Sequence, residues 1–277
     1  MTAPFDLAVA WRIYPGVSKK PLIHSDDKFA LVRTSLRSFQ QSAQGLKISH
    51  HFILDGCPPE YEELIHSLFA NEKHAIINTP KIGNARTFAK QIELLLAQSD
   101  ADVVYFSEDD YLYRPGEFGK LHRLITSDPA VDFVSCYCHR DIFTHPLHQH
   151  ERTVKYAADH MWMGDSSTCL TFMTTKRVLE ETREQFLTYC AGSWDCSVWL
   201  GLTRTHLLNP AAYLKYRNHP ESKRILRMAW KFGWRRWPFL RKYSLYVPFP
   251  GIGTHLEEQF VSPETDWLAV ARAVEGR

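Results

Sequence analysis

Two patterns of hydrophobic and polar residues occur in the first half of the chain. A short apolar run, LAVAWRI at Leu7–Ile13, ends at Tyr14-Pro15-Gly16, which predicts a buried strand and a turn. From Asp26 to Gln41 the apolar residues recur every three or four positions after a Ser25/Asp26 cap. This second pattern predicts an amphipathic helix.

The order of strand then helix repeats along the next hundred residues. Strands are expected at Ile48–Leu54, Ala75–Asn78 and Val103–Phe106, and helices at Pro58–Phe69, Asn84–Ala97 and Pro115–Ile125. Such units favour parallel strands joined by helices that cover the sheet. We therefore expect an α/β fold with a mostly parallel central sheet and helices on both faces.

The second half is less regular, although shorter elements are indicated. Strands are expected at Val131–Tyr137, Thr153–Ala157 and Cys169–Met173, and helices at Thr175–Phe186 and Trp194–Leu202. We find no internal repeat, low-complexity tract or linker. The sequence predicts one domain, residues 1–277, with an irregular half that begins near residue 130.

Composition adds limits to this interpretation. Of the 277 residues, 44% are hydrophobic and 23% are charged, which excludes a disordered or fibrous chain. No stretch of 18 uncharged apolar residues occurs, and Asp6 and Arg12 interrupt the segment that would form the apolar part of a signal peptide. We therefore expect a cytoplasmic protein.

The six cysteines have no spacing typical of a disulfide framework. They are best interpreted as reduced thiols. Cys136, Cys138 and His139 could begin a zinc site, but no second cysteine pair at finger-like spacing follows them. Buried structural thiols are the favoured interpretation.

The net charge of +2 conceals a strongly basic segment. Residues 215–242 contain ten basic residues and one acid, whereas the rest of the chain has 23 basic and 30 acidic residues. A helix over Glu221–Trp237 would place apolar residues on one face and basic residues on the other. The apolar face would hold Ile225, Met228, Ala229 and Phe232, and the basic face Arg224, Arg227, Lys231 and Arg235.

A basic helix with aromatic residues at its edge suits the headgroup layer of an anionic membrane or an anionic acceptor. The alternative is a helix packed on the protein's own core, with a solvent-exposed basic rim. No nucleic-acid-binding motif accompanies the charge, so no nucleic-acid partner is expected.

Polar residues follow each predicted strand of the first half, where parallel sheets bind ligands. They are Arg12 and Tyr14, Asp55-Gly56, Lys81–Arg86 (KIGNAR) and Ser107–Tyr111. The last group contains three consecutive acids, whose repulsion and desolvation a divalent cation would offset. Carboxylates completed by phosphate oxygens and water suit Mg²⁺ or Mn²⁺. An acidic surface turn is the alternative.

The stretch VVYFSEDDYLYRPGEF, residues 103–118, resembles the GT-A glycosyltransferases, which use nucleotide sugars and a DXD-type metal motif. The closest likeness is to the N-acetylglucosaminyltransferase I type, in which a strand ends in EDD and a proline and an aromatic-rich helix follow. Arg12, Asp55-Gly56-Cys57 and the KIGNAR segment extend the resemblance upstream to residue 7.

The resemblance implies roles for residues of the first half. Arg12 and Asp55 would hold the nucleotide base, Lys81 or Arg86 would help to position it, Glu108 would face the ribose or sugar, Asp109 would orient sugar hydroxyls or a metal-bound water, and Asp110 would ligate the metal. Two of these residues could instead have purely structural roles. Asp55 could cap the helix expected from Pro58, and Arg86 could be a helix-surface arginine.

The second half would supply the base and a further metal ligand. Gly192-Ser193-Trp194-Asp195 resembles the Trp-Asp element of inverting members, so Asp195 would be the catalytic base. Cys196 and Ser197 follow where the family often has another acid, and Asp195 could instead serve only as a helix N-terminal residue. His255, after a glycine-rich loop, would complete the metal shell or be an exposed loop histidine.

Four further histidines, His139, His145, His148 and His150, lie close together in the sequence. Their spacing is neither helical nor finger-like, so we interpret them as acceptor-loop or surface histidines.

These features together predict a Mn²⁺- or Mg²⁺-dependent glycosyltransferase of the hexosyltransferase type. It would move a sugar from a nucleoside diphosphate sugar to a hydroxyl of a glycan or glycolipid, as in polysaccharide biosynthesis. Residues 1–130 would bind the donor and 131–277 the acceptor. The segment 215–242 would hold the enzyme near a lipid-linked acceptor at the inner membrane face.

Two other classes are considered. A sugar-nucleotide nucleotidyltransferase usually has a glycine-rich basic loop after its first strand, where this chain has only Pro15-Gly16 and then Lys19-Lys20. A non-catalytic carbohydrate- or nucleic-acid-binding protein would leave the strand-end acids unexplained.

Overall fold

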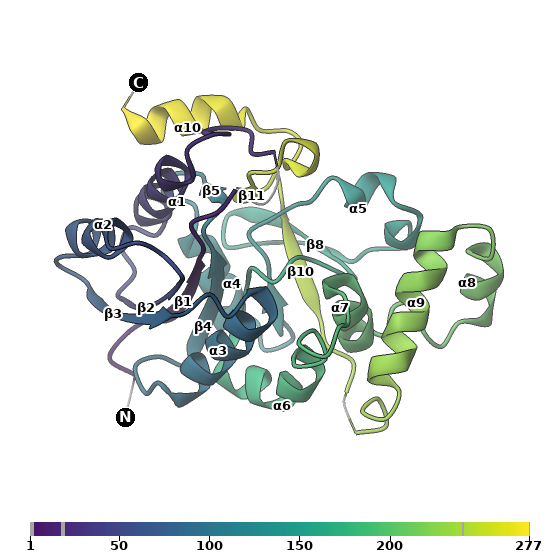
Figure 1. Ribbon diagram of the computed structural model, residues 1–277. Helices are drawn as coiled ribbons and strands as arrows, with labels where there is room; N and C mark the ends of the chain where they lie inside the picture. The colour runs from purple at the N-terminus through teal and green to yellow at the C-terminus, as the bar shows by residue number, and fades with distance from the viewer. Residues whose placement is uncertain (1–2, 18–19, 240, 277) are drawn as a thin grey trace.

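A computed structural model describes residues 3–17, 20–239 and 241–276. Its centre is a nine-stranded sheet with helices on both faces, and a two-stranded sheet lies beside it (Figure 1). The strands of the large sheet lie in the order β3-β2-β1-β4-β9-β6-β10-β8-β7. The expected α/β fold is therefore confirmed.

The first four strands are parallel to one another and agree closely with the sequence pattern. They are β1 (Leu7–Ile13), β2 (Ile48–Asp55), β3 (Lys73–Thr79) and β4 (Val103–Glu108). The helices that connect and follow them are α1 (Lys28–Ser42), α2 (Glu60–Leu68), α3 (Asn84–Ala97) and α4 (Gly119–Ser127). Because these strands run the same way, their carboxyl ends meet at one edge of the sheet.

The second half adds shorter strands and introduces antiparallel pairs. They are β6 (Phe133–Val134), β7 (Val154–Ala157), β8 (His160–Gly164), β9 (Phe172–Thr175) and β10 (Leu245–Phe249). Only β6 and β10 pair in parallel here, while β9 is antiparallel to both β4 and β6. The strand expected at 131–137 is thus much shorter, and β8 and β10 were not predicted.

The helices of this half are α5 (Asp141–Thr144), α6 (Lys176–Phe186), α7 (Asp195–Thr203), α8 (Pro210–Lys215), α9 (Pro220–Gly233) and α10 (Trp267–Glu275). Two 3₁₀ turns are η1 (Pro146–His148) and η2 (Glu258–Phe260). No helix among the described residues combines the length and the apolar character needed to span a bilayer.

Alternate residues of β1 point into two separate cores. Leu7, Val9 and Trp11 pack with residues of α1, α2 and α4, whereas Ala8 and Ala10 pack with α3, α6 and α7. This is the period-2 alternation of a strand buried on both faces. The sheet is therefore fixed between two helical layers, and its strand ends are held rigidly.

A small antiparallel ladder connects the end of the chain to the centre of the sheet. The strand β11 (Gly253–His255) pairs with β5 (Tyr111–Tyr113), and His255 lies opposite Tyr111. Helix α10 then packs through Trp267 against α1 (Figure 1). The C-terminal segment thus returns to the residues that directly follow β4.

The basic helix α9 packs on α7 at the end of the molecule away from α2 (Figure 1). Its apolar residues Ile225, Leu226 and Ala229 are buried in that contact, so they face the protein's own core. Trp230, Trp234 and Phe239 remain 39%, 52% and 87% exposed. The apolar face of the expected amphipathic helix is therefore not available to a partner, but three aromatic residues beside it are.

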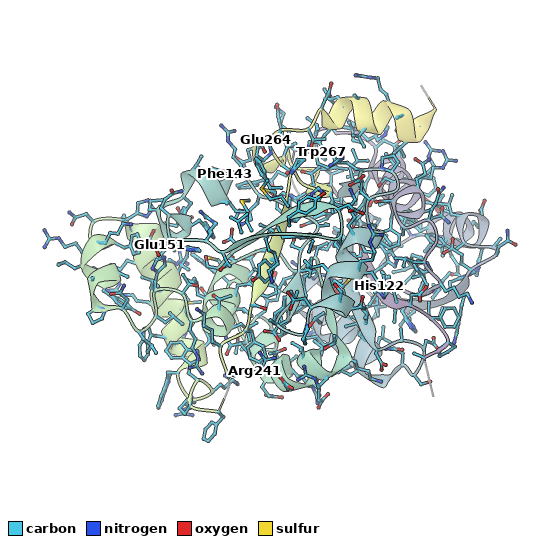
Figure 2. All side chains as sticks on the ribbon, turned by 180° about the vertical axis from the view of Figure 1, so that it is seen from behind. His122, Phe143, Glu151, Arg241, Glu264 and Trp267 are labelled. Atoms are coloured by element: carbon cyan, nitrogen blue, oxygen red, sulfur yellow. The ribbon has the colours of Figure 1, made fainter. Side chains whose placement is uncertain are left out.

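The chain leaves this end of the molecule through Arg241 at the lower edge of the view in Figure 2. The Arg241 guanidinium donates to the buried carboxylate of Asp132 at 3.0 Å, just before β6. Phe143 and Glu151 lie towards the α8–α9 end in the same view, and His122 towards the other end (Figure 2). The long excursion from α7 to β10 is thus anchored beside the sheet.

Candidate active site

The polar residues that follow the parallel strands line one cavity at the sheet edge, which we call the sheet-edge cavity. Its volume is about 350 Å³. Among the residues singled out in the sequence, it gathers Arg12, Asp55, Lys81, Glu108, Asp109 and Asp110. The parallel strand order brings these residues together from positions almost one hundred residues apart.

Arg12 and Glu108 form a partly buried ion pair across β1 and β4. The Arg12 Nη2 lies 2.6 Å from Glu108 Oε1, and the other carboxylate oxygen accepts a hydrogen bond from the Thr171 hydroxyl at 2.8 Å. Arg12 also donates to the carbonyl and the side-chain oxygen of Asn84 in α3. Its guanidinium is thus held by β4 and α3 at the cavity.

Asp109 has a different cation partner. The Lys28 ammonium lies 2.6 Å from Asp109 Oδ1, and these two side chains are only 8% and 9% exposed. The Tyr14 backbone N–H donates to Asp109 Oδ2 at 2.8 Å. Burial raises the pKa of Asp109, a rise that the Lys28 charge opposes. Asp109 therefore fixes the turn after β1 to the start of α1.

Asp55 shapes the wall of the cavity rather than the start of α2. Its carboxylate accepts hydrogen bonds from the Thr79 hydroxyl at 2.8 Å and from the backbone N–H groups of Ile82 and Gly83 at 2.6 and 2.8 Å. Helix α2 has no side-chain cap. The Asp55 side chain thus holds the loop that precedes α3.

The two basic residues of the KIGNAR segment separate in space. Lys81 has a left-handed backbone conformation, with φ at 55°, and its ammonium lies 5.5 Å from the centre of the Tyr14 ring at the cavity. Arg86 is exposed on α3 and does not line the cavity. Asn84, to which the sequence analysis assigned no role, faces Arg12 and accepts its hydrogen bonds.

Asp110 meets His255 through the β5–β11 ladder. The His255 Nε2 lies 3.1 Å from Asp110 Oδ2, although 145 positions separate the two residues. Burial alone would raise the pKa of Asp110, but the charge and the hydrogen bond of His255 outweigh it and hold that pKa below its usual range. Burial alone would lower the pKa of His255, but the charge and the hydrogen bond of Asp110 oppose this effect, and the pKa is raised.

Asp110 has the donor atoms that a hard divalent cation requires. Its Oδ1 is buried and has no hydrogen-bond partner among the described residues, which is costly for a carboxylate oxygen and calls for a cation or water. In the described part of the chain, Glu108 and Asp109 each have a permanent cation as partner, whereas Asp110 has an imidazole. An oxygen of Asp110 and a nitrogen of His255 therefore fit Mn²⁺ or Mg²⁺, with coordination positions left for phosphate and water.

A second cavity, which we call the loop cavity, lies against the irregular half and has a volume of about 280 Å³. His255 belongs to its lining, while its partner Asp110 lines the sheet-edge cavity. The Asp110–His255 contact therefore stands where the two cavities meet. A group that enters from either cavity reaches the same pair of side chains.

Asp195 lines the loop cavity at the first turn of α7. Its Oδ1 accepts a hydrogen bond from the Cys196 backbone N–H at 2.7 Å, and the ring of Trp194 lies beside it in the cavity wall. The Arg224 guanidinium lies 4.3 Å from the centre of the Trp194 ring. Asp195 thus lies at the start of a helix and also lines a cavity. Both roles considered for it in the sequence, helix N-terminal residue and catalytic base, remain compatible with this position.

The cysteines do not form the zinc site that was considered. All six are free thiols, and burial raises the pKa of the Cys136 and Cys138 thiols to about 12. The Cys136 sulfur accepts a hydrogen bond from the Tyr105 hydroxyl at 3.3 Å. His139 instead lies close to His148 and Asp165. The favoured interpretation as buried structural thiols fits this arrangement.

The neighbouring histidines are buried or half-buried rather than surface residues. His139, His145 and His148 line the loop cavity. Burial lowers the pKa of His139 to about 4, so its imidazole is neutral at physiological pH. Burial also opposes ionisation of Asp165, but His148, His139 and Arg152 outweigh it and hold the pKa of Asp165 at about 2.

Sequence reasoning missed Lys28, Asn84 and Thr171. Lys28 had a usable signal, because a lysine in the first turn of a helix opposes the helix dipole and needs another reason to be there. Asn84 and Thr171 had none, because each contact depends on how the strands are ordered in the sheet. They were found only once the fold placed them beside Arg12 and Glu108.

No family model and no curated protein sequence matches this chain. Several solved structures resemble it weakly. A mannosyltransferase from Pyrobaculum calidifontis, solved with GDP-Man and Mn²⁺, has a TM-score of 0.45 and 11% identity over 83% of this chain and 72% of that one. The galactosyltransferase LgtC, solved with donor and acceptor sugar analogues, has a TM-score of 0.42 and 13% identity over 70% of each chain.

A cytidylyltransferase from Leptospira borgpetersenii has a TM-score of 0.38 and 10% identity. The match covers 64% of this chain and 63% of the cytidylyltransferase. Similarity at this level transfers no activity from those proteins to this chain.

The Lys28–Asp109 ion pair gives a test of how the sheet edge is held. Lys28→Met leaves a buried carboxylate without its cation and is expected to lower the free energy of unfolding by about 3–5 kcal/mol. The double variant Lys28→Met/Asp109→Asn is expected to recover about 2 kcal/mol of that loss. Urea denaturation of the wild type, both single variants and the double variant measures the coupling. If the stability loss of the double variant equals the sum of the two single-variant losses to within about 0.5 kcal/mol, the pairing is contradicted.

Proposed function

We propose that this protein is a metal-dependent glycosyltransferase that moves a sugar from a nucleoside diphosphate sugar to an acceptor hydroxyl. The observation that carries the proposal is the Asp110–His255 contact, with its unpartnered buried oxygen, at the junction of two cavities. A transferase of this kind needs one cavity for the donor, one for the acceptor and a cation between them. We assign donor binding mainly to residues 1–130 and acceptor binding to residues 131–277.

The sheet-edge cavity is the proposed donor site. Three cationic side chains line it beside four carboxylates; Arg12 and Lys28 are paired with acids, so Lys81 and a bound divalent cation would mainly attract the diphosphate. Asp55 would accept a hydrogen bond from a base N–H in addition to holding the loop before α3, and Glu108 would face the ribose or sugar. Asp109 would orient a sugar hydroxyl. Arg86 lies outside the cavity, so its part in the proposal is limited to long-range attraction of the donor.

Asp110 and His255 would hold Mn²⁺ or Mg²⁺ together with oxygens of the donor diphosphate. When bound, such a cation neutralises the charge that develops on the departing nucleoside diphosphate. The β5–β11 ladder keeps the two side chains aligned, because His255 lies on β11 and Asp110 directly precedes its partner strand β5. Arg12 and Lys28 keep the neighbouring carboxylates Glu108 and Asp109 compensated, which leaves Asp110 as the acid available to the ion.

Asp195 is the proposed base on the acceptor side. Its carboxylate would take the proton from the acceptor hydroxyl as that oxygen attacks the sugar from the face opposite the leaving group, which inverts the anomeric centre. Trp194 would provide a flat surface beside the acceptor. The Cys196 N–H bound to Asp195 Oδ1 would fix the orientation of the carboxylate.

The surface near the end of α9 is the proposed contact with an anionic membrane that presents a lipid-linked acceptor. Trp230, Trp234 and Phe239 are exposed there, beside Arg235 and Lys231. Each basic residue near an anionic surface contributes about 1 kcal/mol, and the aromatic rings suit the headgroup layer. Because the apolar face of α9 is buried, these side chains would carry the contact.

Asp110→Ala is expected to reduce metal-dependent donor hydrolysis and transfer at least a hundredfold, because about 3 kcal/mol of leaving-group stabilisation would be lost. Release of nucleoside diphosphate from UDP- and GDP-sugars with Mn²⁺ measures the effect. Asp26→Ala, which removes an exposed acid outside both cavities, serves as the control. Full activity in Asp110→Ala would refute the metal role.

Asp195→Asn is expected to lower transfer by about 10²–10⁴-fold while donor binding is kept, because the amide no longer accepts the proton. Single-turnover transfer and calorimetric binding of the nucleoside diphosphate measure the two properties separately. Asp141→Asn alters a second carboxylate of the same cavity and should leave kcat within about threefold. An unchanged transfer rate in Asp195→Asn would remove this residue as the base.

The wild-type protein is expected to sediment with phosphatidylglycerol vesicles at low salt and to be released at high salt. Trp234→Ser/Phe239→Ser should weaken this binding by about tenfold or more, because two exposed aromatic rings no longer enter the headgroup layer. Leu268→Ser on α10 removes an exposed apolar residue at the opposite end of the molecule and is the control. Absence of binding at low salt would exclude membrane contact.

A further inference from the structure

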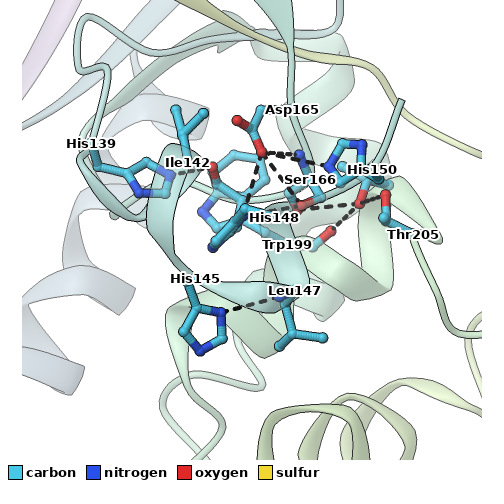
Figure 3. A network of polar contacts seen from close by, with 12 residues as sticks. His139, Ile142, His145, Leu147, His148, His150, Asp165, Ser166, Trp199 and Thr205 are labelled. Atoms are coloured by element: carbon cyan, nitrogen blue, oxygen red, sulfur yellow. Dashed lines mark hydrogen bonds and ion pairs between the residues drawn. The ribbon is translucent and has the colours of Figure 1, made fainter. Parts of the chain in front are cut away.

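Three buried side chains from separate segments converge behind the loop cavity (Figure 3). His139 precedes α5, His148 ends η1 and Asp165 follows β8. The potential ligand atoms of these residues all lie within 4.8 Å of one another. None of them belongs to the proposed donor site, and none is needed by the proposed base.

The distances from the histidines to the carboxylate exceed good hydrogen-bond lengths and suit a shared ion. Ser166 also contacts these atoms: its backbone N–H donates to Asp165 Oδ1 at 2.5 Å, and its hydroxyl lies 3.3 Å from His148 Nδ1. His148 Nδ1 lies 3.5 Å and His150 Nε2 lies 3.9 Å from the same oxygen, Asp165 Oδ1 (Figure 3). Good hydrogen bonds to oxygen fall at about 2.7–3.2 Å. Around tetrahedral zinc, with bonds of about 2.0–2.2 Å, neighbouring ligand atoms are about 3.3–3.6 Å apart.

His150 has the protonation pattern of a ligand. Its Nδ1 lies 2.9 Å from the Glu151 carbonyl oxygen, so Nδ1 carries the proton and donates. In the neutral ring Nε2 then has a lone pair, and this atom is buried without a hydrogen-bond partner. A lone pair that faces a carboxylate oxygen is repulsive unless a cation lies between them. Metal-bound histidines commonly donate their second nitrogen to a carbonyl in this way.

The carboxylate itself is incompletely satisfied. Asp165 Oδ2 is buried and has no hydrogen-bond partner, and the nearest cationic atom, Arg152 Nε, is 3.6 Å away and is also without one. Arg152 therefore balances charge without supplying the missing contact. Unpaired buried atoms of this kind cost about 1–3 kcal/mol each, more when charged.

We propose that His139, His148 and Asp165 bind a zinc ion, with His150, which lies 3.9 Å from Asp165 but outside the three-residue cluster, moving in as the fourth ligand. A set with several imidazoles and a single carboxylate favours Zn²⁺, whereas Mg²⁺ and Mn²⁺ prefer sites in which oxygen ligands dominate. This site is separate from Asp110 and His255 and does not depend on the proposed transferase activity. It takes a resident ion rather than one delivered with the donor.

The ion would stabilise a segment that has little regular structure of its own. Between β6 and β7 the described chain contains only the four-residue α5 and the three-residue η1. His139 and His148 on this segment also line the loop cavity. Zinc would tie both to Asp165 at the end of β8 and so fix one wall of that cavity.

Metal analysis of untagged protein, equilibrated with Zn²⁺ and then freed of excess ion, tests the proposal. One zinc per chain is expected in the wild type, and a chelator should remove it and lower the Tm by several degrees. His148→Gln and Asp165→Asn should each weaken zinc affinity at least a hundredfold, and His150→Gln about tenfold or more, in competition with a chromophoric chelator.

Two controls separate this site from its surroundings. His145→Gln, in the same segment but outside the set, should keep one zinc per chain, as should Asp110→Ala at the donor site. Co²⁺ in place of zinc should give the visible spectrum of a tetrahedral ion. Should Asp165→Asn not fold, the wild-type content and the His148→Gln variant decide. Substoichiometric zinc in the wild type, with no response of the Tm to chelator, would overturn the proposal.

Discussion

Three consecutive carboxylates at the end of β4 impose the constraint around which this molecule is built. Each has its own cation from a different segment: Arg12 of β1 for Glu108, Lys28 of α1 for Asp109 and His255 of β11 for Asp110. Leaving any of these charges buried and unpaired would be costly. The triplet therefore joins the first strand, the first helix and the C-terminal ladder at one point.

The three pairs are not equivalent, and the difference locates the chemistry. Arginine and lysine are permanent cations at neutral pH, so their pairs with Glu108 and Asp109 are complete without any other group. The pair of Asp110 relies on an imidazole, and one oxygen of this carboxylate has no partner. The incomplete pair also lies where the sheet-edge and loop cavities meet. Under the proposed function, a cation would complete this pair at the position where donor and acceptor would meet.

The sequence predicted the features that depend on the local residue pattern and on the parallel order of the strands. Helix α3 was predicted over the residues it occupies, and Arg12, Asp55 and Glu108 share a cavity because parallel strands end at one edge. Strand β10 was missed because it is short and contains Pro248. The cluster around Asp165 could not be predicted. Its histidines lie on irregular backbone, where the spacing of residues in the sequence does not indicate which side chains meet.

The two cavities differ in charge, and this difference constrains the proposed substrates. Each cavity has four carboxylates in its lining, but the sheet-edge cavity also has Arg12, Lys28 and Lys81, whereas the loop cavity has, among the described residues, no lysine or arginine. The carboxylates of the loop cavity are Asp141, Asp195, Glu221 and Glu257. Under the proposed function, the three cations would offset the repulsion between a diphosphate and the acids of the sheet edge, and the loop cavity would suit a neutral, hydroxyl-bearing sugar. Any phosphate of a lipid-linked acceptor would have to remain outside the loop cavity, near the basic residues of α9, because the acidic cavity repels it.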